Sequence, residues 1–402
     1  MFDKTKIRYS SWTQHPATVL FLFTIFILLI RIFLRGQILE VDEAEQVILA
    51  QKLQVGYPDQ PPLYAWLQYV FFKLFGFKLL SLALLKSFLL FGCLYSFHQI
   101  CRLHCPSISL AWCATLSWAL IPAISLDLIK DNTHSILALL SACLSWYWFV
   151  APSKLSKTTW YLILGCIMGM GILSKYNYLL FFAILLVSLV SIPAYRKKVL
   201  NPSMLLALLV SFLIASPYIS WLQHHSSIGL GSTYKLAPPH KQPWQGLTEL
   251  MKAILLFALP PLLIPRFFFP LERKLAQQKA YNSLVLRYHL IAIPLLIAII
   301  LAARLRNFET RWLIPLLFLL PVLYFSQVKH ETKRRINLFL SVCLLVQAAM
   351  FTALIYRSHS NHNLRSHYPF QQVIQLIKNE HQPMDYIVTD SHWFLGNLML
   401  GF

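Results

Sequence analysis

The sequence predicts an all-α protein that crosses a membrane many times, and both its composition and the grouping of its apolar residues predict this. Hydrophobic residues make up 57% of the 402 positions and charged residues only 12%, against roughly a quarter in ordinary soluble domains. The few polar residues could not cover so large an apolar surface in water, so lipid must be the solvent for much of the chain. A soluble enzyme is thereby excluded.

The apolar residues gather in about eleven runs, most of them close to the ~20 residues that a helix needs to cross a bilayer. The first run follows a basic start, and no small-residue cleavage site comes after it, which predicts an anchor rather than a removed signal peptide. The runs cover residues 17–34, 79–100, 108–126, 133–150, 160–173, 178–192, 203–222, 247–265, 290–303, 312–325 and 336–356.

The positive charges predict the orientation. Lys and Arg number 35 against 15 Asp and Glu, and they form short clusters in alternate loops, for example Arg196-Lys197-Lys198, which places these loops and the N-terminus in the cytoplasm. A nucleic-acid-binding protein would gather its cations on one soluble face instead. We therefore expect a multi-pass membrane protein whose partner is the lipid bilayer, not nucleic acid, and whose other loops and tail lie on the outer side.

Two segments outside the apolar runs are long enough to have structure of their own. Within a membrane domain of residues 1–356, the first outer loop, 37–78, contains two amphipathic segments that we expect to lie as juxtamembrane helices, 42–53 and 61–75. Residues 357–402 are more polar and predict the start of an α/β module on the outer side, with a helix over 370–378 and a strand over 386–389. The module stops unfinished, which favours a truncated chain or a minimal tail.

Four carboxylates stand within six residues of the first outer loop: Glu40, Asp42, Glu43 and Glu45. On a helix that begins there, Asp42 and Glu45 share a face. Acids at a helix N-terminus complement the helix dipole, and this explanation is favoured for Glu40 and Glu45. For Asp42 a functional role is favoured, because an acid held close to the bilayer beside a cavity can remove the proton of an acceptor hydroxyl group.

Two further acids bracket the turn before residue 133. Asp131 has two compatible explanations, a functional acid facing a wet cavity or a cap of the helix that follows. Asp127 is expected to be solvated.

Several cations fall in outer loops, where the orientation does not require them. An anionic partner explains Lys175, Arg306 and Arg311, since Arg can bridge two phosphate oxygens and Lys supplies a point charge. They are therefore candidate ligands for a lipid phosphate. The alternative, which has more weight for Arg304 than for Lys175 and Arg311, is that these side chains reach ordinary lipid headgroups.

No strong signal for a metal or a nucleotide is present in the sequence. His224 and His225 are consecutive, so on a helix they face different ways, and a polar contact of His225 to sugar or phosphate is favoured over zinc. A second group has metal-like spacing but is better explained by packing at a helix end: His98, Cys101, His104 and Cys105. Phosphate-cradling glycine loops and hydrolase motifs are not found. We expect no cofactor and leave a divalent metal open.

The first outer loop carries a family resemblance. Val41-Asp42-Glu43-Ala44-Glu45 and the following Gly56-Tyr57-Pro58-Asp59-Gln60-Pro61-Pro62-Leu63-Tyr64-Ala65-Trp66-Leu67 resemble the corresponding loop of bacterial integral-membrane glycosyltransferases of the protein mannosyltransferase type. That group includes the aminoarabinose and galacturonic acid transferases of lipid A. The similarity spans most of residues 37–325, through Asp131, Ser174-Lys175-Tyr176, Pro217-Tyr218, Trp221-Leu222, His225 and Arg311-Trp312-Leu313-Ile314-Pro315.

The resemblance implies a GT-C fold, in which juxtamembrane helices cover an outward-facing cavity in a body of membrane helices. Such enzymes transfer a sugar from a polyprenyl phosphate carrier to an acceptor outside the inner membrane and invert the anomeric carbon. By this resemblance Asp42 matches the catalytic acid, Glu43 is its neighbour in the Asp-Glu pair, and Asp131 matches a second acid near the fourth span. Lipid A or another envelope glycan is the expected acceptor, ahead of protein.

The resemblance also implies a set of substrate-binding residues, and it contains two departures. The candidates are Tyr57, Asp59, Gln60, Tyr64 and His225. Several relatives have Lys at the position of Gln60, and some have His at that of Arg311, so the mode of holding phosphate stays open.

Two other classes of function compete with a glycosyltransferase. A transporter or flippase of a lipid-linked sugar would have charged residues within its spans and inverted repeats; Lys86 and Lys252 lie near span interiors, but no repeat is visible. A noncatalytic membrane assembly protein is the third possibility. The glycosyltransferase interpretation is favoured because a lipid-phosphate donor needs no nucleotide site, Asp42 can act as the base, and Lys175 and Arg311 can hold the phosphate.

Overall fold

The computed structural model describes residues 11–242, 244–271, 280–360, 365, 367–379 and 388–401, and in these ranges the regular structure is helical throughout. Seven helical segments are long and apolar enough to cross a membrane: Pro16–Leu34 (α1 and η2), Leu79–His104 (α4), Thr133–Val150 (α7), Met204–His224 (α11), Gln245–Phe267 (α13 and η6), Ser283–Ala302 (within α14, Ala280–Ala302) and Lys333–His359 (α17). The all-α, polytopic membrane fold predicted from the sequence is confirmed.

The other predicted spans are bent, short or broken. Residues Ile108–Leu120 and Ala123–Lys130 form one pair bent by 78°; they comprise α5 (Ile108–Leu116), η3 (Ser117–Leu120), η4 (Ala123–Asp127) and α6 (Leu128–Lys130). Two segments are shorter helices, α8 (Lys157–Ile172) and α9 (Asn177–Val190). The run 312–325 consists of η7 (Thr310–Leu313), α15 (Ile314–Leu317) and α16 (Leu320–Phe325), because Pro315 and Pro321 cannot donate to a helical ladder.

Close helix packing follows from small residues at one interface. In α8, Gly165 and Gly169 are four residues apart and face α11, and a Cβ atom on Gly165 would lie 2.7 Å from the carbonyl oxygen of Ala207. Small residues at this spacing let two membrane helices approach closely.

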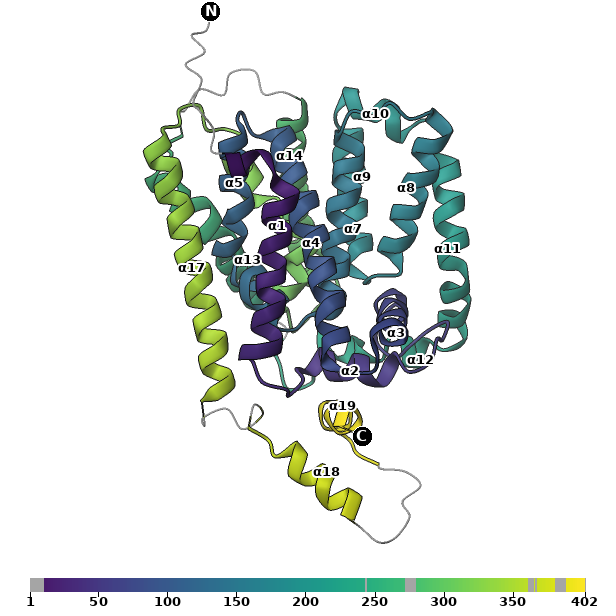
Figure 1. Ribbon diagram of the computed structural model, residues 1–402. Helices are drawn as coiled ribbons and strands as arrows, with labels where there is room; N and C mark the ends of the chain where they lie inside the picture. Colours follow the sequence, from purple (N-terminus) through teal and green to yellow (C-terminus); the bar gives the residue numbers. More distant parts are fainter. Residues whose placement is uncertain are drawn as a thin grey trace, which may run out of the picture.

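The short helices collect at one end of the bundle. Figure 1 shows α2 (Val41–Leu49), α3 (Leu63–Phe75), α12 (Ser226–Gly229), α18 (Phe370–Asn379) and α19 (His392–Gly401) at the end opposite α10 (Pro193–Val199). The remaining 3-10 helices are η1 (Ser11–Gln14) and η5 (Gly231–Leu236). The two amphipathic segments predicted in the first outer loop are α2 and α3. The cluster Arg196-Lys197-Lys198 lies on α10, so the cations predicted to be cytoplasmic and the first outer loop are at opposite ends.

The tail differs in part from the sequence prediction. The helix predicted over 370–378 is α18, but residues 386 and 387 of the predicted strand lie outside the described residues, and Val388 and Thr389 are not in a strand. The helix α19, which the sequence did not indicate, packs along α2. A Cβ atom on Gly396 would lie 2.3 Å from the carbonyl oxygen of Ala44, so only glycine allows this approach. The tail therefore joins the first outer loop.

Candidate functional site

A cavity of about 590 Å³ opens among the elements at this end of the bundle. One part of its wall is apolar and comes from α9, α14 and α15; this part includes Leu180, Leu296, Ile299, Ile300 and Leu316. The other part is charged, with the acids Asp42, Glu45, Asp59, Asp131 and Glu309 and the cations Lys175, Lys235 and Arg311. Such a cavity suits a ligand with an apolar chain and a polar head, and its three cations can bind an anionic group of that head.

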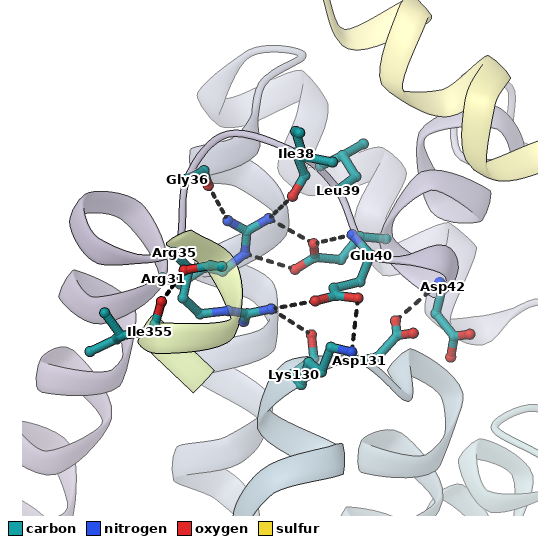
Figure 2. Close-up of polar contacts among 12 residues, drawn as sticks. Arg31, Arg35, Gly36, Ile38, Leu39, Glu40, Asp42, Lys130, Asp131 and Ile355 are labelled. Atoms are coloured by element: carbon teal, nitrogen blue, oxygen red, sulfur yellow. Dashed lines mark hydrogen bonds and ion pairs between the residues drawn. The ribbon is translucent and has the colours of Figure 1, made fainter. Parts of the chain in front are cut away.

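Buried charges fix the start of α2. Glu40 is the N-cap residue, and Glu43 completes a capping box by accepting the Glu40 N–H at Oε2, 3.0 Å away. The Arg31 guanidinium binds Glu43 at both oxygens, at 3.1 and 2.7 Å (Figure 2). Burial disfavours the charged form of Glu43, but the charge and hydrogen bonds of Arg31 outweigh it and lower the pKa of this carboxyl group below its usual range.

Glu40 also forms two ion pairs. Its Oε1 lies 3.1 Å from Arg35 and its Oε2 3.3 Å from Lys130. The explanation of Glu40 as an N-terminal acid of the helix agrees with this geometry. Glu43, predicted to be catalytic from the resemblance, lies off the cavity wall with 3% of its surface exposed, so the structure places it where it holds α2 rather than where it touches substrate.

The Asp131 side chain binds the start of α2, and the Asp42 side chain binds the start of α7. Asp131 Oδ1 accepts the backbone N–H of Asp42 at 3.0 Å, and Asp42 Oδ2 accepts the backbone N–H of Thr133 at 3.2 Å (Figure 2 shows the first of these bonds). Both bonds satisfy N–H groups in a first helical turn that lack a helical partner. The N-cap residue of α7 is Asn132, in the left-handed conformation at φ 60°; Asp131 therefore stabilises α2, not α7 as one of the two sequence explanations held.

The environment changes the protonation of Asp131. Burial, followed by the negative charge of Asp42, raises the pKa of the Asp131 carboxyl group. Asp127, by contrast, is exposed, as the sequence predicts.

Two of the three predicted phosphate ligands lie on the cavity wall. Lys175 Nζ donates to Ser135 Oγ at 2.7 Å, and Arg311 lies 2.5 Å from Glu309 and 3.4 Å from Asn132 Oδ1. Burial, with the nearby positive charge of Arg311, lowers the pKa of Lys175 to about 8. Lys175 and Arg311 each have further N–H donors that can bind an anion in the cavity.

Arg306, the third predicted ligand, lies elsewhere. Its guanidinium reaches the carbonyl oxygens of Pro239 and Lys241 at 3.5 and 3.4 Å, and its backbone N–H donates to Leu236 at 2.9 Å. The prediction that Arg306 holds the donor phosphate does not fit this position; its contacts instead hold the loop after η5.

The predicted substrate-binding residues divide into two groups. Asp59 and Gln60 line the cavity. Tyr57 is buried, with its hydroxyl group donating to the Lys52 carbonyl at 2.7 Å, and Tyr64 packs against His134 with 5.5 Å between ring centroids. The exposed His225 stacks on Trp221 at 5.0 Å. The side chains of Tyr57, Tyr64 and His225 therefore lie off the cavity wall.

The wall also contains residues that were not predicted as site residues, among them Glu45, Lys235 and His392. The sequence did contain a signal for Glu45, since it shares a helix face with Asp42. Burial, with the charges of Asp42 and Asp59, raises the pKa of Glu45 to about 8. His392 could not be connected with this loop by any local pattern, because α19 reaches it through tertiary packing.

Metal-ligand geometry is absent from the part of the chain that the structure describes, where no group of three or more His, Cys, Asp or Glu residues could hold an ion. The His98–Cys105 group packs as the helix-end explanation predicts. His98 pairs with Thr115 at 2.9 Å, and His104 accepts the indole N–H of Trp146 at 3.1 Å.

The fold is of the GT-C type, as the resemblance predicted, and the proteins that are similar in sequence are glycosyltransferases. Residues 59–221 match the family described as dolichyl-phosphate-mannose-protein mannosyltransferase. Among curated proteins, the chain is similar to the lipopolysaccharide core galacturonosyltransferase RgtB of Rhizobium johnstonii, with 27% identity over 375 residues that cover 90% of this chain and 76% of RgtB. RgtA of the same organism is 27% identical over 330 residues, which cover 79% of this chain and 66% of RgtA.

A solved structure shows the same fold. The crystal structure of ArnT from Cupriavidus metallidurans bound to undecaprenyl phosphate superposes with a TM-score of 0.62 at 13% sequence identity, and the match covers 96% of this chain and 75% of ArnT. These findings favour a glycosyltransferase over a transporter.

Proposed function

We propose that this protein transfers a sugar from a polyprenyl phosphate carrier to the core or lipid A part of lipopolysaccharide, with inversion at the anomeric carbon and with Asp42 as general base. The observation that carries the proposal is the cavity itself, in which the Asp42 carboxylate shares a wall with the cations Lys175 and Arg311. The similarity to two lipopolysaccharide core galacturonosyltransferases supports the acceptor class, and it supports galacturonic acid as the sugar.

The donor side of the cavity would bind a lipid phosphate. A polyprenyl chain is anchored in the bilayer, so its phosphate lies near the ends of the membrane helices, where the turns carrying Lys175 and Arg311 are found. The apolar wall suits the first isoprene units of the chain. As the bond from the anomeric carbon to the phosphate oxygen breaks, negative charge grows on the phosphate, and the two cations stabilise it.

The acceptor side would supply the base. The acceptor hydroxyl group attacks the anomeric carbon on the face opposite the phosphate; the new carbon–oxygen bond forms, the carbon–phosphate oxygen bond breaks, and the hydroxyl proton passes to Asp42. The bond from Thr133 N–H to Asp42 Oδ2 orients the carboxylate. Asp131 and Glu43 act as positioning residues that hold the start of α2. Because the phosphate is already a leaving group, the reaction needs no nucleotide or organic cofactor.

The proposed reaction takes place on the periplasmic side, with the N-terminus in the cytoplasm. Supporting this orientation, the cations of α10 lie at the end of the bundle opposite α2 and the cavity (Figure 1), and positive loops favour the cytoplasm.

The test is mass spectrometry of lipopolysaccharide from cells that lack the protein, complemented with wild type or with Asp42→Asn. We expect the variant to insert normally and to lose sugar transfer by roughly 10²- to 10⁴-fold, the usual contribution of general base catalysis. Asp127→Asn is the matched control, since Asp127 is an exposed acid outside the cavity wall. Wild-type transfer by Asp42→Asn would remove this residue from the mechanism, and unchanged lipopolysaccharide in cells without the protein would refute the proposed function.

A further inference from the structure

The helix α19 does more than cover the first outer loop, because its first residue enters the cavity. His392 stands at the start of α19 and is part of the cavity wall, together with Asp42 and Glu45 of α2. The imidazole is exposed, as expected for a side chain at the mouth of a cavity that is open to solvent.

Three contacts fix α19 on the segment that carries Asp42. Asn397 Oδ1 accepts the backbone N–H of Leu39 at 2.8 Å, and Trp393 Nε1 donates to the Leu39 carbonyl at 2.7 Å. The absent side chain of Gly396 lets the two helix backbones touch at Ala44. The position of His392 relative to Asp42 is thus set by directional hydrogen bonds and by a steric fit, not by a loose surface contact.

The place of α19 in the fold indicates which substrate His392 meets. In Figure 1, α19 lies beyond α2 on the side away from the spanning helices. The donor phosphate must stay near the ends of the spanning helices, because its polyprenyl chain is held in the bilayer. A glycan acceptor has a polar headgroup that extends into water, so it approaches the cavity from the side of α19.

We propose that His392 contacts the acceptor glycan at the cavity mouth, so that α19 forms the acceptor side of the active site. This inference rests on the proposed function and adds an acceptor-binding residue to it. A neutral imidazole both donates and accepts hydrogen bonds, which matches a sugar hydroxyl group. Proton removal remains with Asp42, and His392 orients the acceptor toward it.

The experiment measures the initial rate of transfer by the purified full chain in detergent. The donor is synthetic polyprenyl phosphate galacturonic acid, and the acceptor is lipopolysaccharide from cells that lack the protein. For His392→Ala we expect the KM for lipopolysaccharide to rise roughly 3- to 10-fold, the loss of about one neutral hydrogen bond, while the KM for the donor stays constant. His392→Gln keeps a donor and an acceptor atom and should restore part of the affinity.

Two controls separate this role from a structural one. His224→Ala makes the same change at an exposed histidine outside the cavity wall and should leave both KM values unchanged. Equal size-exclusion profiles and thermal midpoints for His392→Ala and wild type show that α19 stays in place. Unchanged acceptor KM in His392→Ala, or equal increases in both KM values, overturns the inference while the proposed function stands; if wild type transfers no sugar, the proposed function itself fails.

Discussion

The ion pair of Arg31 and Glu43 gives the most direct test of how the active site is supported. Replacing Arg31 with Met removes both hydrogen bonds to Glu43 and those to the carbonyl groups of Gly36 and Ile38. The side chains of the pair are only 7% and 3% exposed, so water cannot replace the lost partner. Breaking such a pair from one side costs about 3–5 kcal/mol, because a buried charge is left uncompensated.

A double-mutant cycle measures this coupling. Unfolding by titration with sodium dodecyl sulfate in mixed micelles gives the free energy of unfolding of wild type, Arg31→Met, Glu43→Gln and the double variant. Because the neutral amide that Glu43→Gln introduces needs no counter-charge, we expect the double variant to be more stable than additive losses predict, with a coupling energy of about 2 kcal/mol or more. Additive losses, or a single-variant cost below about 1 kcal/mol, would show that the pair does not hold α2.

Two further predictions concern the charged wall of the cavity. The raised pKa of Glu45 means that folding favours its neutral form; its contribution to stability is complete below about 4.5 and is lost as the pH rises through about 8. Glu45→Gln cannot ionise, so its free energy of unfolding should exceed that of wild type by a margin that grows from pH 6 to about pH 8, by on the order of 2 kcal/mol, and then levels off. A difference that does not change with pH would contradict the raised pKa. For Lys175→Ala and Arg311→Ala we expect the KM for the lipid-phosphate donor to rise about tenfold each, from the loss of a charged hydrogen bond. The control Arg304→Ala removes a cation of the same outer turn that lies off the cavity wall, and it should leave the donor KM unchanged. A normal donor KM in both cavity variants would exclude Lys175 and Arg311 as phosphate ligands.

Local patterns predicted the helices because each depends on neighbouring residues. Every predicted apolar run contains helix in the structure, and the run 133–150 has the same bounds as α7. Hydropathy did not predict where a helix breaks. The run 312–325 is as apolar as a membrane span, but Pro315 and Pro321 lack the N–H groups that a continuous helix needs.

The site was predicted less completely, because a cavity wall is made by residues that are far apart in sequence. Asp42 and Glu43 are adjacent acids in one motif, yet one lies on the cavity wall and the other is buried against Arg31. Their separation depends on which face of α2 packs against η2. Arg306 and His225 carry suitable chemical groups, but their own neighbours bind them away from the cavity.

By itself the sequence determined that lipid is the solvent, how the spans are ordered, which end carries the acidic loop, and that Asp42, Lys175 and Arg311 stand in that loop or at turns of the same side. These properties follow from composition and short-range periodicity, which do not depend on how the helices pack. Only the tertiary structure decided that Glu45, Lys235 and His392 complete the cavity wall. Leu39 and Trp393 are 354 positions apart. A contact over this distance in sequence depends on how the helices pack in three dimensions, and local sequence patterns contain no information about it.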